Sequence, residues 1–402
     1  MGKAIATAQP STAVSGDEGS VFGGTGTPAT EAQAQFYITE AATLSYFQAY
    51  IYSGGSGTNT VTLRDTGVNT SVTANRSGIG ALSDTTNSAT FAAADLANYA
   101  FTDTGTDPLY TYTSIVVSFS SGHGNFYSSS GTVSFATAST TRYISFAGAM
   151  TSETTEANAQ VKNRAWTSVE AIQVYVSANA RTTTTTVRNR TNAANGTGSF
   201  TIGSGVTGNL RDTTIGDAIA SGDLLCLSVT TGTGAQTLTM TLAGATLKSS
   251  SGLKCDVYNQ AASGLAGQLI GAGGGFTEAA PYASGLLSAL GTGVYTEANS
   301  GIPAPYAFVA SNPRCYVAVN DFTASTTYNL RKNSTTAISV AVGAGLTGWF
   351  EDTASVVDYA VGDTFYAQFT STETDAGLTV SVANISVTVN QRVPRSSAMV
   401  LS

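Results

Sequence analysis

The sequence repeats itself three times, and this triplication constrains the fold more than any other feature. A Thr-Glu-Ala tripeptide occurs in each copy, and a tyrosine follows its threonine after twenty residues. The threonines are Thr30, Thr155 and Thr296, and the tyrosines are Tyr50, Tyr175 and Tyr316. Self-similarity at a regular spacing is the mark of repeated structural units. We therefore expect three equivalent units in one chain.

A second motif keeps the same register in every copy. A glycine precedes an aspartate by four residues, threonine follows that aspartate, and a further aspartate lies eleven residues on. The aspartate pairs are Asp84 and Asp95, Asp212 and Asp223, and Asp352 and Asp363, with arginines upstream at Arg64, Arg188 and Arg331. A glutamine two residues before the repeated tyrosine, Gln48 or Gln173, is replaced by Arg314 in the third copy. Two motifs in register indicate internal triplication.

Each copy has the pattern of a β protein. Apolar and polar residues alternate in 44–52, 169–176 and 378–389, with Val, Ile, Thr, Tyr and Phe enriched, which is typical of strands with one buried face. Gly, Asn and Asp cluster between these segments and favour turns. Closely spaced strands with polar turns predict sandwiches. The expected fold is all-β, with three tandem antiparallel β-sandwich domains of jelly-roll or Ig-like type.

The motifs also set the expected domain bounds. They place an N-terminal arm at 1–21, repeats at 22–121, 122–250 and 251–390, and a C-terminal tail at 391–402. The third repeat carries a Gly/Ala-rich segment at 261–305 that has no counterpart of equal length, and we expect it to be an insertion.

Composition excludes several classes of protein. Only 10% of the residues are charged, the formal net charge is −8, and no Lys/Arg cluster stands out, so nucleic acid is not an expected partner. No apolar run is long enough to span a bilayer. The first residues lack the apolar core of a secretory signal peptide, so we expect synthesis in a cytoplasm.

The repeated aspartates have two interpretations. As turn residues, their carboxylates would accept hydrogen bonds from nearby backbone N–H groups, while the glycines supply positive φ. Alternatively, each pair would form half of a Ca²⁺ site, because calcium takes six to eight oxygen ligands. The turn interpretation is favoured, and no cofactor or metal is expected.

Catalytic residues are not expected either. His123 is the single histidine, and its neighbouring glycines at a domain junction predict an exposed loop, which is a poor place for a triad base. Glu31, Glu156 and Glu297 repeat with the copies, and a repeated acid indicates a repeated structural need. Cys226 is expected in a core, and pairing of Cys255 with Cys315 is left open.

The copies resemble a pattern of bacteriophage virion structural proteins: an Arg-x-Asn hairpin, then Gly-x-Thr-Gly-x-Phe-x-Asp-Thr, then Gly-Asp opening a strand. The third copy fits best, through Arg331-Lys-Asn333, 345–353 and Gly362-Asp363. The second fits through 205–208, Asp212-Thr213 and Gly222-Asp223, and in the first Ser77 and Ala94 replace two glycines. The resemblance implies a structural part of a virion and brings no catalytic residue with it.

We therefore expect a non-enzymatic exterior protein of a phage particle: a capsid decoration protein, a head fibre, or a collar or tail appendage. Its partners would be major capsid, neck or tail proteins, with self-association as a further option. The alternatives are a subunit of a bacterial extracellular filament or surface layer, and a glycan- or receptor-binding adhesin. The three repeats could form a pseudo-trimer, stack end to end, or belong to chains that trimerise.

Overall fold

Six mainly antiparallel sheets, two in each repeat, make up the protein. The computed structural model describes residues 2–8, 18–19, 30–54, 56–105, 108–120, 122–249, 254–260, 268–271, 282–284, 301–371 and 379–392. The all-β fold expected from the sequence is confirmed. Within these residues, no helix has the length and apolar character needed to cross a membrane.

The first repeat has one sheet of order β1-β9-β4-β7 and a second of order β2-β8-β5-β6, with β3 beside β8. One helical turn, α1, precedes β3. The bounds are β1 Ala4–Ala8, β2 Glu18–Gly19, α1 Glu31–Ala34, β3 Phe36–Tyr37, β4 Ala42–Ser53, β5 Thr58–Asp65, β6 Val68–Ser77, β7 Gly80–Phe91, β8 Leu96–Asp103 and β9 Leu109–Phe119.

The second repeat has the same plan. Its sheets have the orders β12-β10-β20-β14-β17 and β11-β19-β15-β16, with β18 beside β14 and β13 beside β19. The bounds are β10 His123–Phe135, β11 Thr141–Ile144, β12 Gly148–Ala149, α2 Glu156–Ala159, β13 Val161–Lys162, β14 Ser168–Asn179, β15 Thr185–Thr191, β16 Ala194–Ile202, β17 Gly208–Asp212, β18 Asp217–Ala218, β19 Leu224–Thr231 and β20 Leu238–Ser249.

The third repeat again has two sheets, of orders β21-β31-β25-β28 and β23-β30-β26-β27. Strands β22, β29 and β24 pair with β31, β25 and β30. The bounds are β21 Lys254–Gln260, β22 Gln268–Gly271, β23 Tyr282–Ser284, β24 Ile302–Pro303, β25 Phe308–Asn320, β26 Thr326–Lys332, β27 Thr335–Val342, β28 Gly348–Glu351, β29 Val356–Tyr359, β30 Thr364–Ser371 and β31 Thr379–Gln391.

These strand orders define the type of sandwich. When the eight main strands of a repeat are numbered along the chain, one sheet has the order 1-8-3-6 and the other 2-7-4-5 in all three repeats. Each sheet thus takes strands from both halves of the repeat, as in the double Greek key of a jelly roll. The sandwiches are jelly rolls, and the Ig-like alternative is wrong.

Two segments differ from their expected roles. Residues Ala4–Ala8, placed by the sequence in an N-terminal arm, form β1 and pair with β9 in register from Ala4 with Val117 to Ala8 with Thr113. The described parts of 261–305, predicted to be an insertion, supply β22, β23 and β24 to the two sheets. Glycine and alanine have low strand propensity, and this composition concealed those strands.

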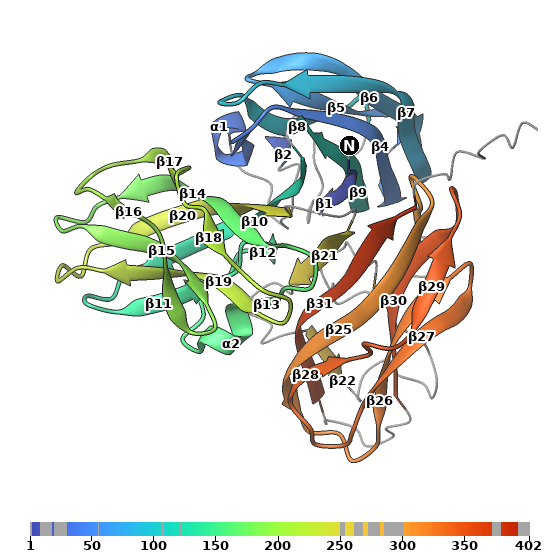
Figure 1. Ribbon diagram of the computed structural model, residues 1–402. Coiled ribbons are helices and arrows are strands. Elements are labelled where there is room, and N and C mark those ends of the chain that lie inside the picture. The colour runs from blue at the N-terminus through green and yellow to red at the C-terminus, as the bar shows by residue number, and fades with distance from the viewer. Residues whose placement is uncertain are drawn as a thin grey trace, which may run out of the picture.

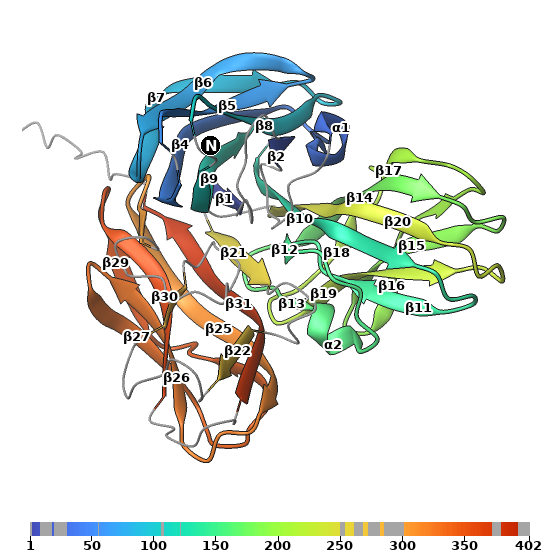
Figure 2. The ribbon, with the colours of Figure 1, turned by 180° about the vertical axis from the view of Figure 1, so that it is seen from behind.

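The three jelly rolls surround a common centre. Figures 1 and 2 show three lobes, with the first main strand of each repeat, β1, β10 and β21, directed toward the middle of the molecule. Each lobe contacts the other two: β1 lies against both β10 and β21, and β12 of the second lobe lies against β21 of the third. The molecule is therefore built as a pseudo-trimer and not as an end-to-end stack.

Candidate functional site: the repeated motifs and the junction of the three jelly rolls

The first aspartate of each repeated pair accepts hydrogen bonds from nearby backbone N–H groups, at the end of a strand in the second and third repeats and within β7 in the first. Asp212 accepts hydrogen bonds from the backbone N–H groups of Thr214 and Ser199 at 3.0 and 3.1 Å. Its counterparts do the same, Asp84 from Thr73, Thr86 and Asn87 and Asp352 from Ala354 and Ser355. Hydrogen bonds from Ser355 lower the pKa of Asp352 below its ordinary value.

The second aspartate of each pair joins two loops. Its carboxylate accepts a hydrogen bond from the backbone N–H three residues earlier, as Asp363 does from Ala360 at 2.7 Å. In the third repeat Asn333 also donates to Asp363, at 2.6 Å, and accepts from the N–H of Thr364. Hydrogen bonds from Lys332 and Asn333 lower the pKa of Asp363 to about 2. In the second repeat Asp223 likewise accepts from the N–H of Ala220 and from Asn192, and Asn192 accepts from the N–H of Leu224. In the first repeat Asp95 accepts from the N–H of Ala92, and Thr66 replaces the asparagine as acceptor for the N–H of Leu96.

The repeated glutamate and arginine form an ion pair. Glu156 at the start of α2 pairs with Arg190 of β15 at 2.8 Å, and Glu31 pairs with Arg64 of β5 at 3.3 Å. The arginine equivalent to Arg64 and Arg331 is therefore Arg190, and the sequence-based choice of Arg188 is wrong. Each of the three arginines also donates to the backbone carbonyl three residues on, at Gly67, Ala193 and Ser334. Glu297 lies outside the described residues.

These contacts account for the motifs as folding elements. The motif residues hold strand ends and connections together in the second and third jelly rolls, and in the first Asp84 makes the same kind of backbone contacts within the continuous strand β7. The hydrogen bonds occupy carboxylate oxygens that a calcium ion would need as ligands. Within the described part of the chain, no three His, Cys, Asp or Glu side chains are grouped so as to hold a metal ion.

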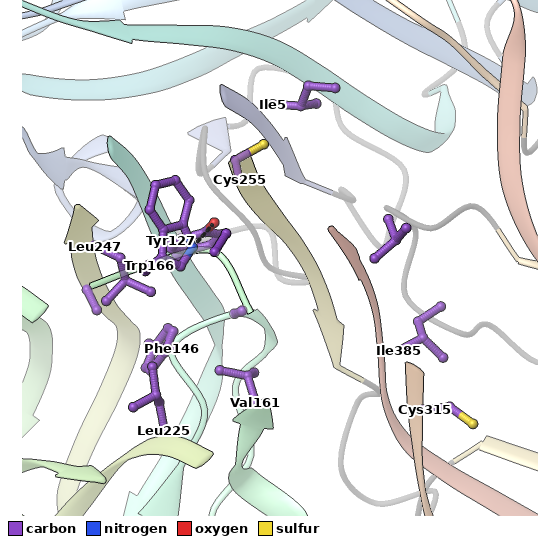
Figure 3. Close-up of a cluster of buried hydrophobic side chains, with 14 of the residues drawn as sticks. Ile5, Tyr127, Phe146, Val161, Trp166, Leu225, Leu247, Cys255, Cys315 and Ile385 are labelled. Carbon is purple, nitrogen blue, oxygen red and sulfur yellow. Dashed lines mark hydrogen bonds between the residues drawn. The ribbon is translucent and has the colours of Figure 1, made fainter. Parts of the chain in front are cut away.

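The centre of the molecule is an apolar junction built from all three repeats. Tyr127 of β10 and Trp166 lie together, and the indole N–H donates to the phenol oxygen at 2.9 Å (Figure 3). The Tyr127 hydroxyl in turn donates to the backbone carbonyl of Asp256 in β21. Cys255 of β21 lies beside Ile5 of β1 (Figure 3). The burial of these residues joins the cores of the lobes.

His123 belongs to this junction. The sequence predicts an exposed loop residue, but His123 begins β10 and is only 5% exposed. Its Nε2 is hydrogen-bonded to the carbonyl of Lys254, and its ring stacks on Trp166 with centroids 5.4 Å apart. Chain packing at the domain boundary therefore buries the residue despite its flanking glycines.

A buried ion pair fastens the second and third repeats together. Arg314 of β25 and Asp256 of β21 are both fully buried, with Nη2 and Oδ1 3.0 Å apart. Arg314 also donates through Nε to the carbonyl of Lys162 in β13 at 2.9 Å. The Asp256 carboxylate accepts from the backbone N–H groups of Arg164 and Ala165 at 2.6 and 3.1 Å. Both charges are thus held by groups from the neighbouring repeat as well as by each other.

Glu351 adds a second charged contact at this boundary. It lies at the end of β28 in the third repeat and binds Lys162 and Arg164 of the second. Burial raises the pKa of Glu351, but hydrogen bonds from Arg164 and Lys162 outweigh this effect, so that its pKa falls below the ordinary 4.5.

The boundary between the first and second repeats is neutral at the equivalent position. Gln173, which occupies the place of Arg314, accepts from the N–H of Tyr37 at 2.9 Å and donates to its carbonyl at 3.1 Å. Phe36 packs on Gly244, where a Cβ atom would come within 2.6 Å of the ring. Glycine at this position therefore lets an aromatic ring of one jelly roll approach the sheet of the next closely.

The third boundary closes the ring of repeats. Tyr306 donates through its hydroxyl to the carbonyl of Lys3 at 2.9 Å, and the N–H of Lys3 donates to Gln391 at 3.0 Å. Gln48, equivalent to Gln173, is buried, but its Oε1 accepts no hydrogen bond. Gln173 accepts its hydrogen bond from the N–H of Tyr37. The counterpart of Tyr37 in the third repeat is Pro303, which has no N–H to donate to Gln48.

All three cysteines are buried and free, so Cys255 and Cys315 do not pair. Burial raises the pKa of Cys255 to about 12. A thiol held neutral in this way is a poor nucleophile, which fits the role of Cys226, Cys255 and Cys315 as small core residues.

Sequence reasoning missed most of the junction. Tyr127, Trp166 and Asp256 belong to no repeated motif, and their contacts join residues far apart in the chain. One signal was present: Arg314 replaces a glutamine within a strand, and a buried arginine requires a buried acid.

Comparisons with known proteins add little to this description. The sequence matches no described protein family, and no curated protein matches it. The chain is similar to a solved structure described as "The Triple Jelly Roll Fold and Turret Assembly in an Archaeal Virus", with 12% identity over 89% of this chain and 81% of that chain, and a TM-score of 0.18. At so low a TM-score this likeness bears no weight, and the fold assignment rests on the sheet orders.

Proposed function

We propose that this chain is a non-enzymatic structural component of a bacteriophage particle, carried on its exterior as a decoration or appendage protein. The observation that carries the proposal is the closed arrangement of three equivalent jelly rolls around one centre. Jelly rolls are a common building unit of viral capsids. A pseudo-trimer also has the symmetry needed to occupy a threefold position with a single chain.

The hydrogen bonds of the repeated aspartates and of His123 support a structural role. Every repeated aspartate accepts a hydrogen bond from a backbone N–H group. His123 is buried with its Nε2 bonded to a backbone carbonyl. The side chains with the most familiar catalytic chemistry are thus engaged in holding the lobes and turns together.

An adhesin would be expected to expose aromatic side chains on one lobe. Among the described residues, the large apolar side chains that are exposed are aliphatic: Val68, Ile79, Val206, Val319, Leu346, Val356 and Val361. Singly exposed aliphatic residues are common on protein surfaces. No contact in the described lobes favours sugar binding over a structural role.

Electron microscopy of the native fraction in which mass spectrometry finds this chain would test the proposal. We expect the chain to co-sediment with tailed particles, and antibody labelling to place it on the head, neck or tail. Sedimentation with capsid-free filaments from cells would refute the virion proposal and identify the chain as a filament or surface-layer subunit. Native mass spectrometry adds a second test, because an obligate trimer of chains would remove the single-chain pseudo-trimer.

A further inference from the structure

The single histidine of the chain lies where the three repeats meet. His123 begins β10 of the second repeat, and its Nε2 is hydrogen-bonded to the carbonyl of Lys254 at the start of β21 in the third. Gly2, which precedes β1 of the first repeat, packs against the other ring nitrogen. The imidazole is thus enclosed by residues from all three jelly rolls.

The enclosure leaves no room for rearrangement. A Cβ atom at Gly2 would come within 2.1 Å of Nδ1 of His123. Trp166 covers a face of the ring. A change in charge on this ring therefore acts directly on the contacts that hold β1, β10 and β21 together.

The described charged side chains around the ring do not pair with it. Burial lowers the pKa of His123, and the hydrogen bond to the backbone of Lys254 opposes this effect only in part. No described carboxylate forms an ion pair with the imidazole. The neighbouring charged side chains are Lys254, which is exposed, Lys248, which pairs with Glu40, Asp256, which pairs with Arg314, and Arg164, which pairs with Glu351.

We propose that His123 is an acid-sensitive latch: uptake of a proton by its ring loosens the packing of Gly2, Lys254 and Trp166 around it and opens the junction of the three jelly rolls. The closed junction favours the neutral ring, whereas an open junction exposes the ring to water. Opening therefore becomes more favourable as the pH falls below about 6.5, by at most roughly tenfold per pH unit. This inference does not depend on a virion role.

The pH range that tests the latch is free of most other titrations. Carboxylates ordinarily titrate below about pH 5 and there is no second histidine. Asp65 is the one described carboxyl whose pKa is raised, through burial. Asp65→Asn is therefore the matched control, because it tests whether titration of this carboxyl, and not of His123, causes a pH effect.

Cys255 provides a reporter for opening of the junction. It is fully buried beside Ile5, whereas Cys226 lies within β19 of the second jelly roll. Full-length protein is labelled with 4,4′-dithiodipyridine, which reacts at acidic pH, and the rate at each cysteine is followed by mass spectrometry. We expect the ratio of the Cys255 rate to the Cys226 rate to rise about tenfold from pH 7 to 5.5. The ratio should stay flat in His123→Gln and rise as in the wild type in Asp65→Asn.

Two results would overturn the latch: a wild-type ratio that does not change with pH, or an equal rise in His123→Gln. If that variant does not fold, the wild-type protein still decides the question, because its one histidine gives one Cε1–H resonance. We expect this resonance to titrate with a midpoint below 6.5 while the Cys255 ratio rises. Titration at or above 6.5, as in an exposed histidine, would show that the closed junction does not disfavour the proton.

Discussion

Replacement of Arg314 by glutamine should weaken the boundary between the second and third jelly rolls. Glutamine stands at the equivalent positions 48 and 173, so the strand itself accepts the side chain. In Arg314→Gln, the fully buried Asp256 loses its counter-charge. It keeps the N–H groups of Arg164 and Ala165 and the hydroxyl of Thr388 as hydrogen-bond donors.

The expected loss of stability follows from this geometry. Two unit charges 3.0 Å apart attract each other by about 5 kcal/mol at an effective dielectric constant of about 20. Breaking a buried pair by removal of one partner generally costs about 3–5 kcal/mol. Because three hydrogen bonds to Asp256 remain, we expect a loss near the lower limit, about 3 kcal/mol.

Both tryptophans of the chain, Trp166 and Trp349, lie near this boundary, so urea unfolding followed by tryptophan fluorescence is the assay. Arg392→Gln is the matched control, because Arg392 pairs with Asp358 while both side chains are more than half exposed; we expect a change below about 1 kcal/mol. The double variant Arg314→Gln/Asp256→Asn should lose less than the sum of the single variants. A loss below 1 kcal/mol in Arg314→Gln, or additive losses in the double variant, would refute the reasoning.

Three further predictions concern other parts of the junction. The pKa of Glu351 is lowered on folding, so its ion pairs stabilise the protein above about pH 4.5 and lose this effect as the pH falls through the lower pKa of the folded state. Glu351→Gln should therefore reduce the dependence of the urea unfolding midpoint on pH between 5 and 3. An unchanged dependence would contradict this prediction. Gly244→Val should cost about 1–3 kcal/mol by overpacking against Phe36. A thermal midpoint equal to that of Ala81→Val, the control at an exposed position of β7, would argue against close packing there. The three buried thiols should react with Ellman's reagent at pH 8 only on the timescale of unfolding, and rapid reaction of the native protein would show that they are accessible.

The sequence was sufficient to predict the architecture because triplication presents each local pattern three times. The strand pattern around Tyr50, Tyr175 and Tyr316 became β4, β14 and β25, and the aspartate turns close loops as expected from their chemistry. Composition was misleading where a strand is rich in alanine, as in β1, or lies within a Gly/Ala-rich segment, as β22 does. Local propensity there is overridden by pairing with a long neighbouring strand, β9 or β31.

The junction could not be predicted in the same way. His123 was expected to be exposed because glycines surround it, yet its burial is decided by Gly2 and Lys254, which are remote in sequence. The contact of Asp256 with Arg164 similarly depends on how two finished domains meet. Such contacts leave no periodic pattern in the sequence. The one sequence feature that pointed to them was Arg314 at the position where the other two repeats have glutamine.

The closed ring of repeats changes how the assembly can vary. In a homotrimer a substitution alters three interfaces at once, and dilution separates the subunits by mass action. Here one substitution alters one interface, and the covalent linkage keeps the lobes at a fixed effective concentration. The neutral contact of Gln173 with Tyr37 and the contact of the charged Arg314 with Lys162 occupy equivalent places. A gene that encodes all three lobes can thus give each boundary between lobes its own strength.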